Sequence, residues 1–242
     1  MKPPLVSVIM PVLNEAAAIE QRLAEFASDQ QPYELIIVDG GSTDATRQIV
    51  RGFIDTRPAH TPDAPGPPIR LLASAPGRAQ QMNRGAAVAR GNVLLFLHAD
   101  TRLPPMAIKN IEQAMLTGCL WGRFDVKLYG KHWRYRVIER AMNRRSVLTG
   151  IATGDQAMFV RRDLFRMLDG FARVPLMEDI ELSKRLKGID QPARIRERVT
   201  TSVRRWEQNG VLRTVWLMWT LRLLYWVGVA PRRLARWYQQ PR

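Results

Sequence analysis

Short apolar runs alternate with helical patterns through the first half of the chain. The apolar runs, rich in Val, Ile and Leu, lie at residues 6–10, 35–38, 69–72 and 93–97, and the helical patterns lie at 15–28, 44–54 and 79–89. Strands that are apolar on both faces are typical of a parallel sheet covered by helices on both sides. The alternation therefore predicts a doubly wound α/β layer around a mostly parallel sheet.

The second half is less regular. Residues 122–127 and 155–160 predict strands, 192–204 predicts one or two more, and helices are predicted at 131–145, 163–168 and 178–187. The sequence shows no internal repeat and no low-complexity tract. We therefore expect one continuous domain over residues 1–207, followed by a helical C-terminal segment over residues 208–242.

The C-terminal segment is apolar from residue 211 to residue 230, apart from two arginines and two threonines. On a helix, Arg213 and Arg222 would point to opposite faces. Arg222 would cost about 2.5–3.5 kcal/mol in a membrane span, which disfavours one. The segment is then either packed in the core or a dimer interface, or a helix pair lying in the membrane surface. In the membrane-surface alternative, the aromatic anchors would be Trp216, Trp219, Trp226 and Trp237, and the lipid-phosphate ligands would be Arg232, Arg233 and Arg236.

The composition excludes several classes of protein. The 242 residues are 46% hydrophobic and 24% charged, which fits a globular protein and rules out disorder, collagen and coiled coil. The single cysteine, Cys119, excludes a disulfide framework and a thiolate zinc cluster, and it suits a reducing compartment. The first apolar run is too short for a signal peptide. We expect a cytoplasmic protein or one that is peripheral at the inner face of the cell membrane.

The charge is divided unevenly between the two halves. Residues 1–120 hold 11 Lys and Arg against 11 Asp and Glu, residues 121–242 hold 26 against 11, and the net charge of +15 therefore lies in the second half. This asymmetry indicates a polyanionic partner, which could be nucleic acid, an anionic membrane or phosphorylated ligands. The alternative is a genomic bias, since 31 of the 37 basic residues are Arg. Nucleic acid is not expected as a partner, because the sequence has no helix-turn-helix, zinc-finger or RNP-like signature.

Polar clusters follow three of the predicted strands. Asn14-Glu15 follows the first strand, residues 39–44 follow the second, and His98-Ala99-Asp100 follows the fourth. In an open α/β sheet, ligands bind beyond the carboxyl ends of the strands. Helix capping would explain several of these residues. It does not account for Asp39 or Asp100, because a carboxylate at the end of a buried strand is costly unless it binds something.

These clusters resemble the motifs of the family 2 glycosyltransferases of the GT-A fold. The matching motifs run in order over roughly residues 5–205 and lie at 11–15, 38–44, 83–85, 89–91, 95–100 and 177–179. The string Gly-Arg-Ala-Gln-Gln-Met-Asn at 77–83, with the His-Ala-Asp triplet and residues 204–207, further resembles a bacterial subgroup, the radical-SAM/selenodomain-associated transferases. The resemblance implies a Rossmann-like GT-A sheet flanked by helices and a glycosyltransferase of the hexosyltransferase type.

The resemblance also implies a nucleotide-diphospho-sugar as the donor substrate. It places Pro11 and Glu15 in the nucleoside pocket and makes Asp39 a hydrogen-bond acceptor for the base or the ribose. Arg78 and Asn83 would face the nucleotide as well, and an arginine is suited to a pyrophosphate oxygen.

The metal motif departs from the family pattern. The family's Asp-x-Asp reads His98-Ala99-Asp100 here, which leaves Asp100 as the expected ligand of Mg²⁺ or Mn²⁺. A hard cation bound to a diphosphate often takes only one or two oxygens from protein, so Asp100 can suffice. His98 would hydrogen-bond the ribose where the first Asp usually does. The tightness of metal binding and the choice between the two cations stay open.

A Glu-Asp pair before a helix supplies the catalytic base in this family, which maps onto Asp179 with Glu178 beside it. Adjacent carboxylates raise each other's pKa, which favours a base that works near neutral pH. The alternative is that both residues only favour the positive end of the following helix. Arg205 and Trp206 resemble the Arg-Trp of the family's Gln-x-x-Arg-Trp motif, whose Gln position is Ser202 here. The resemblance places Arg205 on the diphosphate.

We therefore expect a glycosyltransferase that acts with inversion, by analogy with the family, on a lipid-linked or small acceptor. One alternative is a nucleotidyltransferase or a degenerate nucleotide-sugar-binding protein, which His98 keeps open. Others are a basic nucleic-acid-binding protein and a scaffold at the membrane surface. The C-terminal segment could also join copies of the chain into a homo-oligomer.

Overall fold

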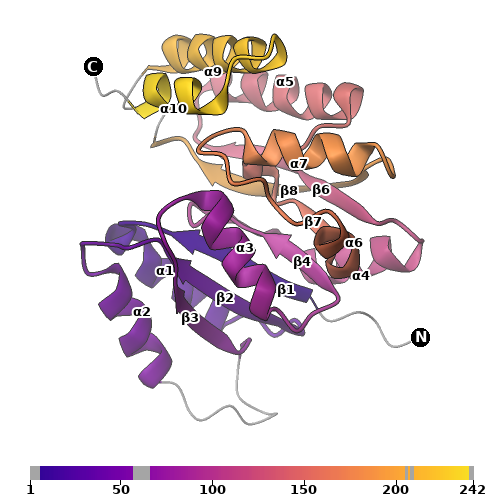
Figure 1. Cartoon of the computed structure of the whole chain (residues 1–242). Coiled ribbons are helices and arrows are strands. Elements are labelled where there is room, and N and C mark those ends of the chain that lie inside the picture. Colours follow the sequence, from indigo (N-terminus) through magenta and orange to yellow (C-terminus); the bar gives the residue numbers. More distant parts are fainter. Residues whose placement is uncertain (1–5, 57–65, 205–206, 208–209, 240–242) are drawn as a thin grey trace.

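The computed structural model describes residues 6–56, 66–204, 207 and 210–239. Its strands are β1 (Val6–Val12), β2 (Tyr33–Asp39), β3 (Ile69–Ala73), β4 (Val93–Phe96), β5 (Thr101–Arg102), β6 (Trp121–Tyr129), β7 (Phe159–Arg161) and β8 (Ala193–Ser202). Its helices are α1 (Ala16–Ala27), α2 (Thr46–Asp55), α3 (Arg78–Val88), α4 (Ala107–Leu116), α5 (Trp133–Thr149), α6 (Arg162–Met167), α7 (Glu178–Lys187), α9 (Val211–Trp226) and α10 (Pro231–Gln239). The strands form one mixed sheet in the order β3-β2-β1-β4-β7-β6-β8-β5, flanked by helices (Figure 1).

The first four strands of that order are parallel, and β2, β1 and β4 are buried on both faces, whereas the edge strand β3 is only partly buried. β1 pairs with β2 along its whole length and with β4 over Val6 to Ile9. Val6, Val8 and Met10 join a core with α1, α2 and α4, whereas Ile9 joins a second core with α3, α6 and α7. Alternate residues of one strand thus enter two different cores, which is why the predicted runs are apolar throughout.

Helix α3 lies close against the sheet because of Gly85. A Cβ at this position would lie 2.5 Å from Cγ2 of Ile9, closer than packed atoms allow. Since α3 follows the carboxyl end of β3, its first residue, Arg78, lies at the carboxyl edge of the parallel strands.

The other half of the sheet is mixed in direction. β7 runs antiparallel to both β4 and β6, and β8 runs parallel to β6.

One strand prediction is wrong here, because residues 155–160 do not form a single strand. Gly154–Gln156 makes a 3₁₀ turn, η1, closed by a capping box between Thr153 and Gln156, and Ala157 has a φ of 46°. The chain therefore turns before it can pair, and β7 begins only at Phe159.

Two elements, β5 and α4, were not predicted from the sequence. β5 has only two residues, and α4 buries Ala107, Ile108 and Ile111. Such a short strand and such a narrow apolar face give little periodic signal. The 192–204 region forms the one strand β8, and the predicted helices over 131–145, 163–168 and 178–187 correspond to α5, α6 and α7.

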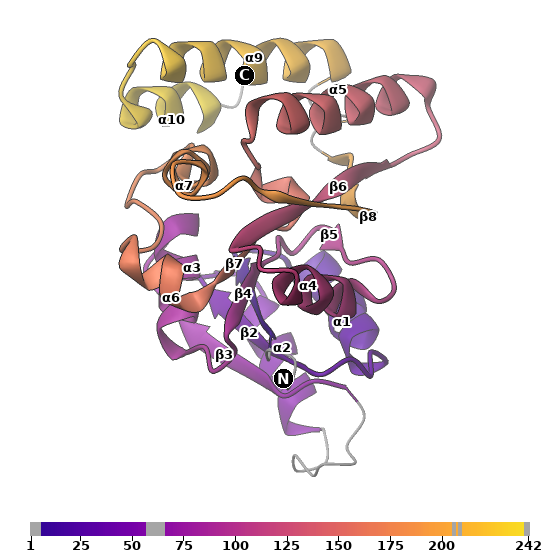
Figure 2. The ribbon, with the colours of Figure 1, turned by 90° about the vertical axis from the view of Figure 1, so that its right-hand side faces the viewer.

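The C-terminal segment forms two helices that pack on α7. Leu221 of α9 and Leu234 of α10 share an apolar cluster with Met177 and Ile180. Figures 1 and 2 show α9, α10 and α5 in one layer on the side of the molecule beyond α7. Within the described ranges, every helix is too short or too polar to cross a membrane.

Candidate active site

The polar clusters of the sequence gather at one edge of the sheet. Asn14 and Glu15 follow β1, Asp39 ends β2, and His98 and Asp100 follow β4. Because β1 lies between β2 and β4 in the sheet, the carboxyl ends of these three strands are neighbours. The predicted ligand-binding edge is therefore assembled from the elements expected to form it.

Side chains lock the loops after β1 and β2 together. Asn14 Oδ1 accepts a hydrogen bond from the Thr43 N–H (2.9 Å), and the Asn14 N–H donates to Ser42 Oγ (3.0 Å). The Asp44 carboxylate accepts from the Ala16 N–H (3.0 Å) in the first turn of α1. Asp44 also accepts from the Thr46 N–H (3.0 Å) at the start of α2, so it caps α1 as well as the helix that it precedes.

Glu15 is at the N-cap position of α1, yet its side chain makes no capping hydrogen bond. Partial burial raises the pKa of its carboxyl group, Arg204 at 3.7 Å opposes that shift, and nearby Asp100 adds to it. The positive charge of Arg78 is also within electrostatic range. The structure thus brings together Glu15, Arg78 and Asp100, three residues expected to face the donor and its metal.

Asp39 is buried, and its carboxylate is held largely by its own loop. It accepts hydrogen bonds from the N–H groups of Gly41 (3.1 Å) and Ser42 (3.2 Å), and Arg47 Nε lies 3.6 Å away. These partners offset the cost of burying the charge. Contact between Asp39 and a base or ribose stays a prediction.

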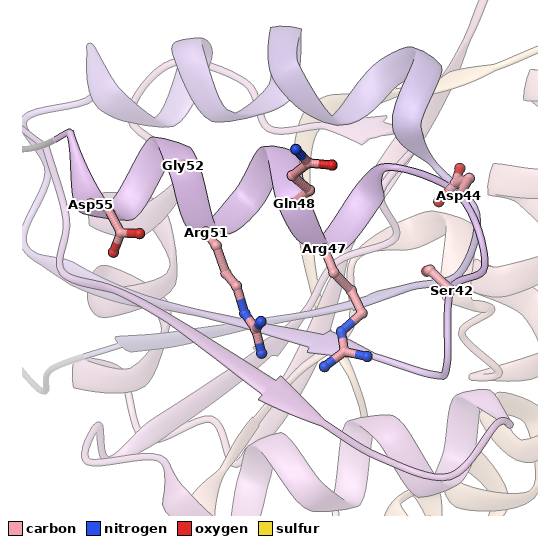
Figure 3. Close-up of a pocket in the computed structure, with 7 residues that line it drawn as sticks. All are labelled: Ser42, Asp44, Arg47, Gln48, Arg51, Gly52 and Asp55. Carbon is pink, nitrogen blue, oxygen red and sulfur yellow. The ribbon is translucent and has the colours of Figure 1, made fainter.

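A polar pocket of about 580 Å³ lies along α2 beside this loop (Figure 3). It is lined by Ser42, Asp44, Arg47, Gln48, Arg51, Gly52 and Asp55. Arg47 and Arg51 extend to the same side of the helix, and Ser42 and Asp44 lie at its N-terminal end. The pocket therefore borders the loop predicted to contact the nucleoside, whereas Asp100 and Asp179 are not among its lining residues.

His98 packs against the η1 turn. A Cβ on Gly154 would lie 2.4 Å from His98 Nε2, so glycine is needed there, and His98 Nδ1 lies 3.5 Å from Asp155 Oδ1. Burial would raise the pKa of Asp155, but the interactions with His98, Arg78 and Arg222 outweigh it and hold the pKa at about 2. Asp155 is therefore ionised at neutral pH and fixes the imidazole ring against the turn.

Glu178 and Asp179 begin α7. Met177 before them has a φ of 69°, a left-handed conformation that is uncommon for a large side chain and clusters at functional sites. Asp179 Oδ2 accepts from the Gly154 N–H (2.7 Å), and Oδ1 accepts from the Ile180 N–H (2.7 Å). Burial, and after it the charge of Asp179, raises the pKa of Glu178. The two adjacent carboxyl groups thus have different environments, as acid–base sites require. Their place in the first turn of α7 also agrees with the alternative that they only favour the positive end of the helix.

Asp100 is an exposed carboxylate at this edge. Thr101 Oγ1 lies 3.4 Å from its Oδ1, and its backbone carbonyl accepts from the Ser202 N–H (3.1 Å). In the part of the chain that the structure describes, no group of three His, Cys, Asp or Glu side chains could hold a metal ion. Asp100 therefore fits a cation that takes one oxygen from protein and the rest from a diphosphate and water, as Mg²⁺ does at phosphate sites.

The remaining predicted residues have different surroundings. Pro11 is buried in β1 opposite Val38. The Asn83 amide bonds the Phe171 backbone at both ends, donating to the carbonyl (2.8 Å) and accepting from the N–H (2.9 Å). It thereby ties α3 to the loop before α7, and both of its polar atoms are engaged by protein. Arg205 and Trp206 lie outside the described residues.

Two arginines that were not placed in the site from the sequence lie beside Asp179. Arg145 of α5 and Arg222 of α9 interact electrostatically with each other and with Asp179 and Asp155. No local motif marks them, because they are far apart in the chain and meet only through the packing of α9 on α7. The one signal in the sequence was the isolated charge of Arg222 within an apolar helix.

The sequence matches Glycosyl transferase family 2 over residues 7–168. The chain belongs to this family. A PGL/p-HBAD biosynthesis glycosyltransferase of Mycobacterium tuberculosis is 38% identical over 107 residues, which cover 43% of this chain and 38% of the relative. An undecaprenyl-phosphate 4-deoxy-4-formamido-L-arabinose transferase of Aeromonas hydrophila is 32% identical over 118 residues, covering 47% and 34%. The chain therefore matches less than two fifths of either relative's length.

Similarity to solved structures extends over more of the chain. The mannosyltransferase PcManGT from Pyrobaculum calidifontis, in complex with GDP-Man and Mn²⁺, superimposes with a TM-score of 0.65 at 22% identity. The superposition covers 96% of this chain and 67% of that one. This likeness confirms the predicted GT-A fold, and the family match confirms the predicted glycosyltransferase class.

Proposed function

We propose that this glycosyltransferase moves a hexosyl group from a nucleotide-diphospho-sugar to the hydroxyl of a lipid-linked or small acceptor, with inversion. The observation that carries the proposal is the arrangement around His98. Glu15, Arg78 and Asp100 gather on the side of the strand ends, and Asp179 lies across the η1 turn from them. Neighbours with this fold include a complex with GDP-Man and Mn²⁺.

Asp100 would hold the divalent cation through one carboxylate oxygen. The cation would supply positive charge to the leaving diphosphate, whose developing negative charge is the main electrostatic demand of the reaction. Arg78 lies within electrostatic range of Glu15, Asp155 and Glu178, so its guanidinium is placed between the two sides of the site. It is suited to bind a diphosphate oxygen directly.

Asp179 would act as the base. It takes the proton of the acceptor hydroxyl, the acceptor oxygen bonds to the anomeric carbon, and the bond from that carbon to the diphosphate oxygen breaks. The nucleoside diphosphate leaves with the electron pair of the broken bond. One displacement of this kind inverts the anomeric centre. The backbone N–H groups of Gly154 and Ile180 keep the Asp179 carboxylate in position.

A thermal-shift panel of nucleoside diphosphates, with and without Mg²⁺ or Mn²⁺, tests the donor site. A ligand at about 100 times its Kd stabilises the fold by roughly 2.7 kcal/mol, which shifts melting by several degrees. We expect one nucleotide to stabilise the wild type in the presence of metal, and Asp100→Ala to lose the metal-dependent part. Asp163→Ala, which removes an exposed carboxylate of α6, is the matched control. No shift with any nucleotide would contradict the proposal.

The released product separates this proposal from its alternatives. Glycosyl transfer releases a nucleoside diphosphate, nucleotidyl transfer releases pyrophosphate, and a degenerate binder releases neither while still binding the nucleotide. Salt-dependent binding to DNA without any response to nucleotides would favour the nucleic-acid alternative. The radical-SAM/selenodomain-associated subgroup, the domain boundary at residue 207 and a homo-oligomer through the C-terminal segment stay predictions.

The C-terminal helices support a position at a membrane surface. Trp216, Trp219, Leu223 and Trp226 recur every three or four residues along α9 and are 60–76% exposed, opposite the face that packs on α7. Trp237 of α10 is also exposed, and exposed arginines lie nearby in sequence at positions 213, 232, 233 and 236. Aromatic side chains flanked by arginines suit the interface of an anionic bilayer.

Vesicle co-sedimentation tests this surface. We expect binding to vesicles that contain phosphatidylglycerol, weaker binding to pure phosphatidylcholine, and a marked loss in the double variant Trp216→Ser/Trp219→Ser. Leu116→Ser, which removes an exposed apolar side chain of α4, is the control and should bind normally. Equal binding by the double variant would contradict a membrane role for α9.

A further inference from the structure

Two half-buried arginines beside the proposed base have no carboxylate partner within ion-pair distance among the described residues. Arg145 comes from α5 and Arg222 from α9. The Nε atoms of both side chains are buried and have no hydrogen-bond partner. An unpaired donor of this kind is uncommon in a folded protein, because burial removes its water without replacing it.

The surroundings hold Arg145 in place without neutralising it. Its Nη2 donates to Ser146 Oγ (2.9 Å) and lies 3.5 Å from Thr153 Oγ1. Burial and, after it, the like charge of Arg222 lower the pKa of Arg145 to about 10, and burial lowers the pKa of Arg222 as well. Both groups stay protonated at neutral pH, so two neighbouring positive charges share one partly buried region.

The nearby carboxylates are engaged elsewhere. Asp179 accepts the N–H groups of Gly154 and Ile180, and Asp155 pairs with His98. Both acids attract the arginines through space, but neither lies within 4 Å of their nitrogen atoms. A further anion between the two guanidinium groups would therefore satisfy donors that the protein itself leaves open.

The position of the pair identifies which substrate would bring that anion. On the side of the strand ends, Glu15 interacts electrostatically with Arg204, Asp100 and Arg78. The arginine pair instead interacts with Asp179, the residue proposed to take the acceptor's proton. The pair is therefore on the side of the proposed base, where the acceptor would bind.

We propose that Arg145 and Arg222 bind the phosphate group of a phosphorylated acceptor. Two guanidinium forks offer the paired N–H donors that a tetrahedral phosphate accepts best, and a second arginine makes the site selective for a doubly charged group. This inference rests on the proposed function, because it assigns the acceptor class of the same site. It also explains why α9 carries a charge on the flank of its packed face.

Calorimetric titration with inorganic phosphate tests the subsite. The titration is made with and without a saturating nucleoside diphosphate and Mg²⁺, so that phosphate does not simply occupy the donor site. We expect saturable binding to the wild type and a Kd raised about tenfold or more in Arg145→Met and in Arg222→Met, since each loses charge-assisted hydrogen bonds. Arg213→Met, which removes an exposed arginine from the same helix, should bind as the wild type does.

Melting temperatures of the ligand-free variants give an independent readout. Arg222→Met removes a half-buried charge that has no ion-pair partner and keeps an apolar stem, so the variant should melt at the same temperature as the wild type or higher. If Arg222 instead had a structural role, its replacement would lower the melting temperature of the protein. Unchanged phosphate affinity in both Met variants, or equal loss in Arg213→Met, would overturn the subsite. Nucleotide binding in the panel described above is unaffected by that result, so the two proposals fail separately.

Two phosphate esters distinguish the source of the anion. Glycerol 3-phosphate represents a small soluble acceptor, and dodecyl phosphate below its micellar concentration represents a lipid phosphate. Tighter binding of dodecyl phosphate would identify a lipid source, and equal binding would identify a soluble one. Both results support the subsite, provided that the affinity falls in Arg222→Met.

Discussion

The two sides of the site hold their charged groups in opposite ways. On the side of β1 and β2, Asp39 and Asp44 are satisfied by backbone N–H groups of their own and neighbouring loops. On the side of α5, α7 and α9, Arg145 and Arg222 are half-buried, with no carboxylate partner within ion-pair distance among the described residues and with Nε atoms that make no hydrogen bond. These two aspartates need no further partner, whereas the arginines have donors that a substrate can fill. A site of this kind can keep a fixed donor pocket and a substrate-dependent acceptor pocket.

The charge of the chain follows the same division. The first 120 residues carry no net charge, and the remaining residues carry all of the +15. Part of that excess lies on the exposed face of α9 and α10, and part lies on half-buried arginines near Asp179. The uneven charge that indicated a polyanionic partner thus has two locations in the structure, one facing outward and one facing the reaction centre.

Replacing the proposed base, Asp179, should have the largest effect, because it should abolish most of the activity without changing nucleotide binding on the other side of the site. Asp179→Asn keeps an oxygen that can accept the Gly154 N–H but cannot take a proton at neutral pH. We expect kcat to fall by about 10²–10⁴, the range for loss of a general base, with the Kd for the nucleotide unchanged. Steady-state kinetics and calorimetry check the two quantities. Activity close to wild type would show that another group accepts the proton, and weaker nucleotide binding would show that the two sides are not separate.

The reverse experiment damages the donor side and leaves the acceptor side intact. Asn14→Ala loses the hydrogen bond that Asn14 Oδ1 accepts from the Thr43 N–H and places alanine at a φ of 54°. The lost hydrogen bond and the left-handed backbone together should cost about 1–2 kcal/mol of unfolding free energy. Nucleotide affinity should fall, while phosphate binding at Arg145 and Arg222 should not.

Asn14→Gly is the matched control for this variant. Glycine removes the same side chain but tolerates positive φ, so urea unfolding should place it between the wild type and Asn14→Ala. If both variants unfold as the wild type does and bind nucleotide normally, the locked loops do not shape the donor side.

The same comparison shows what the sequence could predict. The strand ends carrying Glu15, Asp39 and Asp100 follow directly from apolar runs, because a buried parallel strand has a strong local signal and its carboxyl end has a fixed place in the fold. The first turn of α7 was also predictable, since its acidic residues favour a helix start. These features depend on a few neighbouring residues each.

The acceptor side depends on contacts between distant segments. Arg222 comes within electrostatic range of Asp179 because Leu221 packs in one cluster with Met177 and Ile180, and nothing in residues 211–226 alone specifies that packing. The η1 turn was mistaken for part of a strand because a capping box with a left-handed Ala157 interrupts an otherwise apolar run. Tertiary contact and backbone conformation decided these points, and neither has a periodic signal in the sequence.

The smallest expected effect concerns the carboxyl group beside the base. Burial and the charge of Asp179 raise the pKa of Glu178 above its ordinary value of 4.5. The contribution of Glu178 to stability is therefore fully present below pH 4.5 and is lost as the pH rises through its folded-state pKa, because the charged form is disfavoured only in the folded chain. Each unit of that shift is worth about 1.4 kcal/mol, and Glu178→Gln should recover it at pH 7.

Melting curves at pH 7 and at pH 4 check this prediction. Glu178→Gln should melt above the wild type at pH 7, and the difference should vanish at pH 4, where the wild-type carboxyl is already neutral. Glu181→Gln is the control on the same helix, because Glu181 pairs with Arg185 and should lose a little stability at pH 7. A gain for Glu178→Gln that is equal at both pH values would mean that packing, not charge, sets its effect. A lower melting temperature for Glu178→Gln at pH 7 would mean that the fold stabilises the ionised form of Glu178, which would contradict its raised pKa.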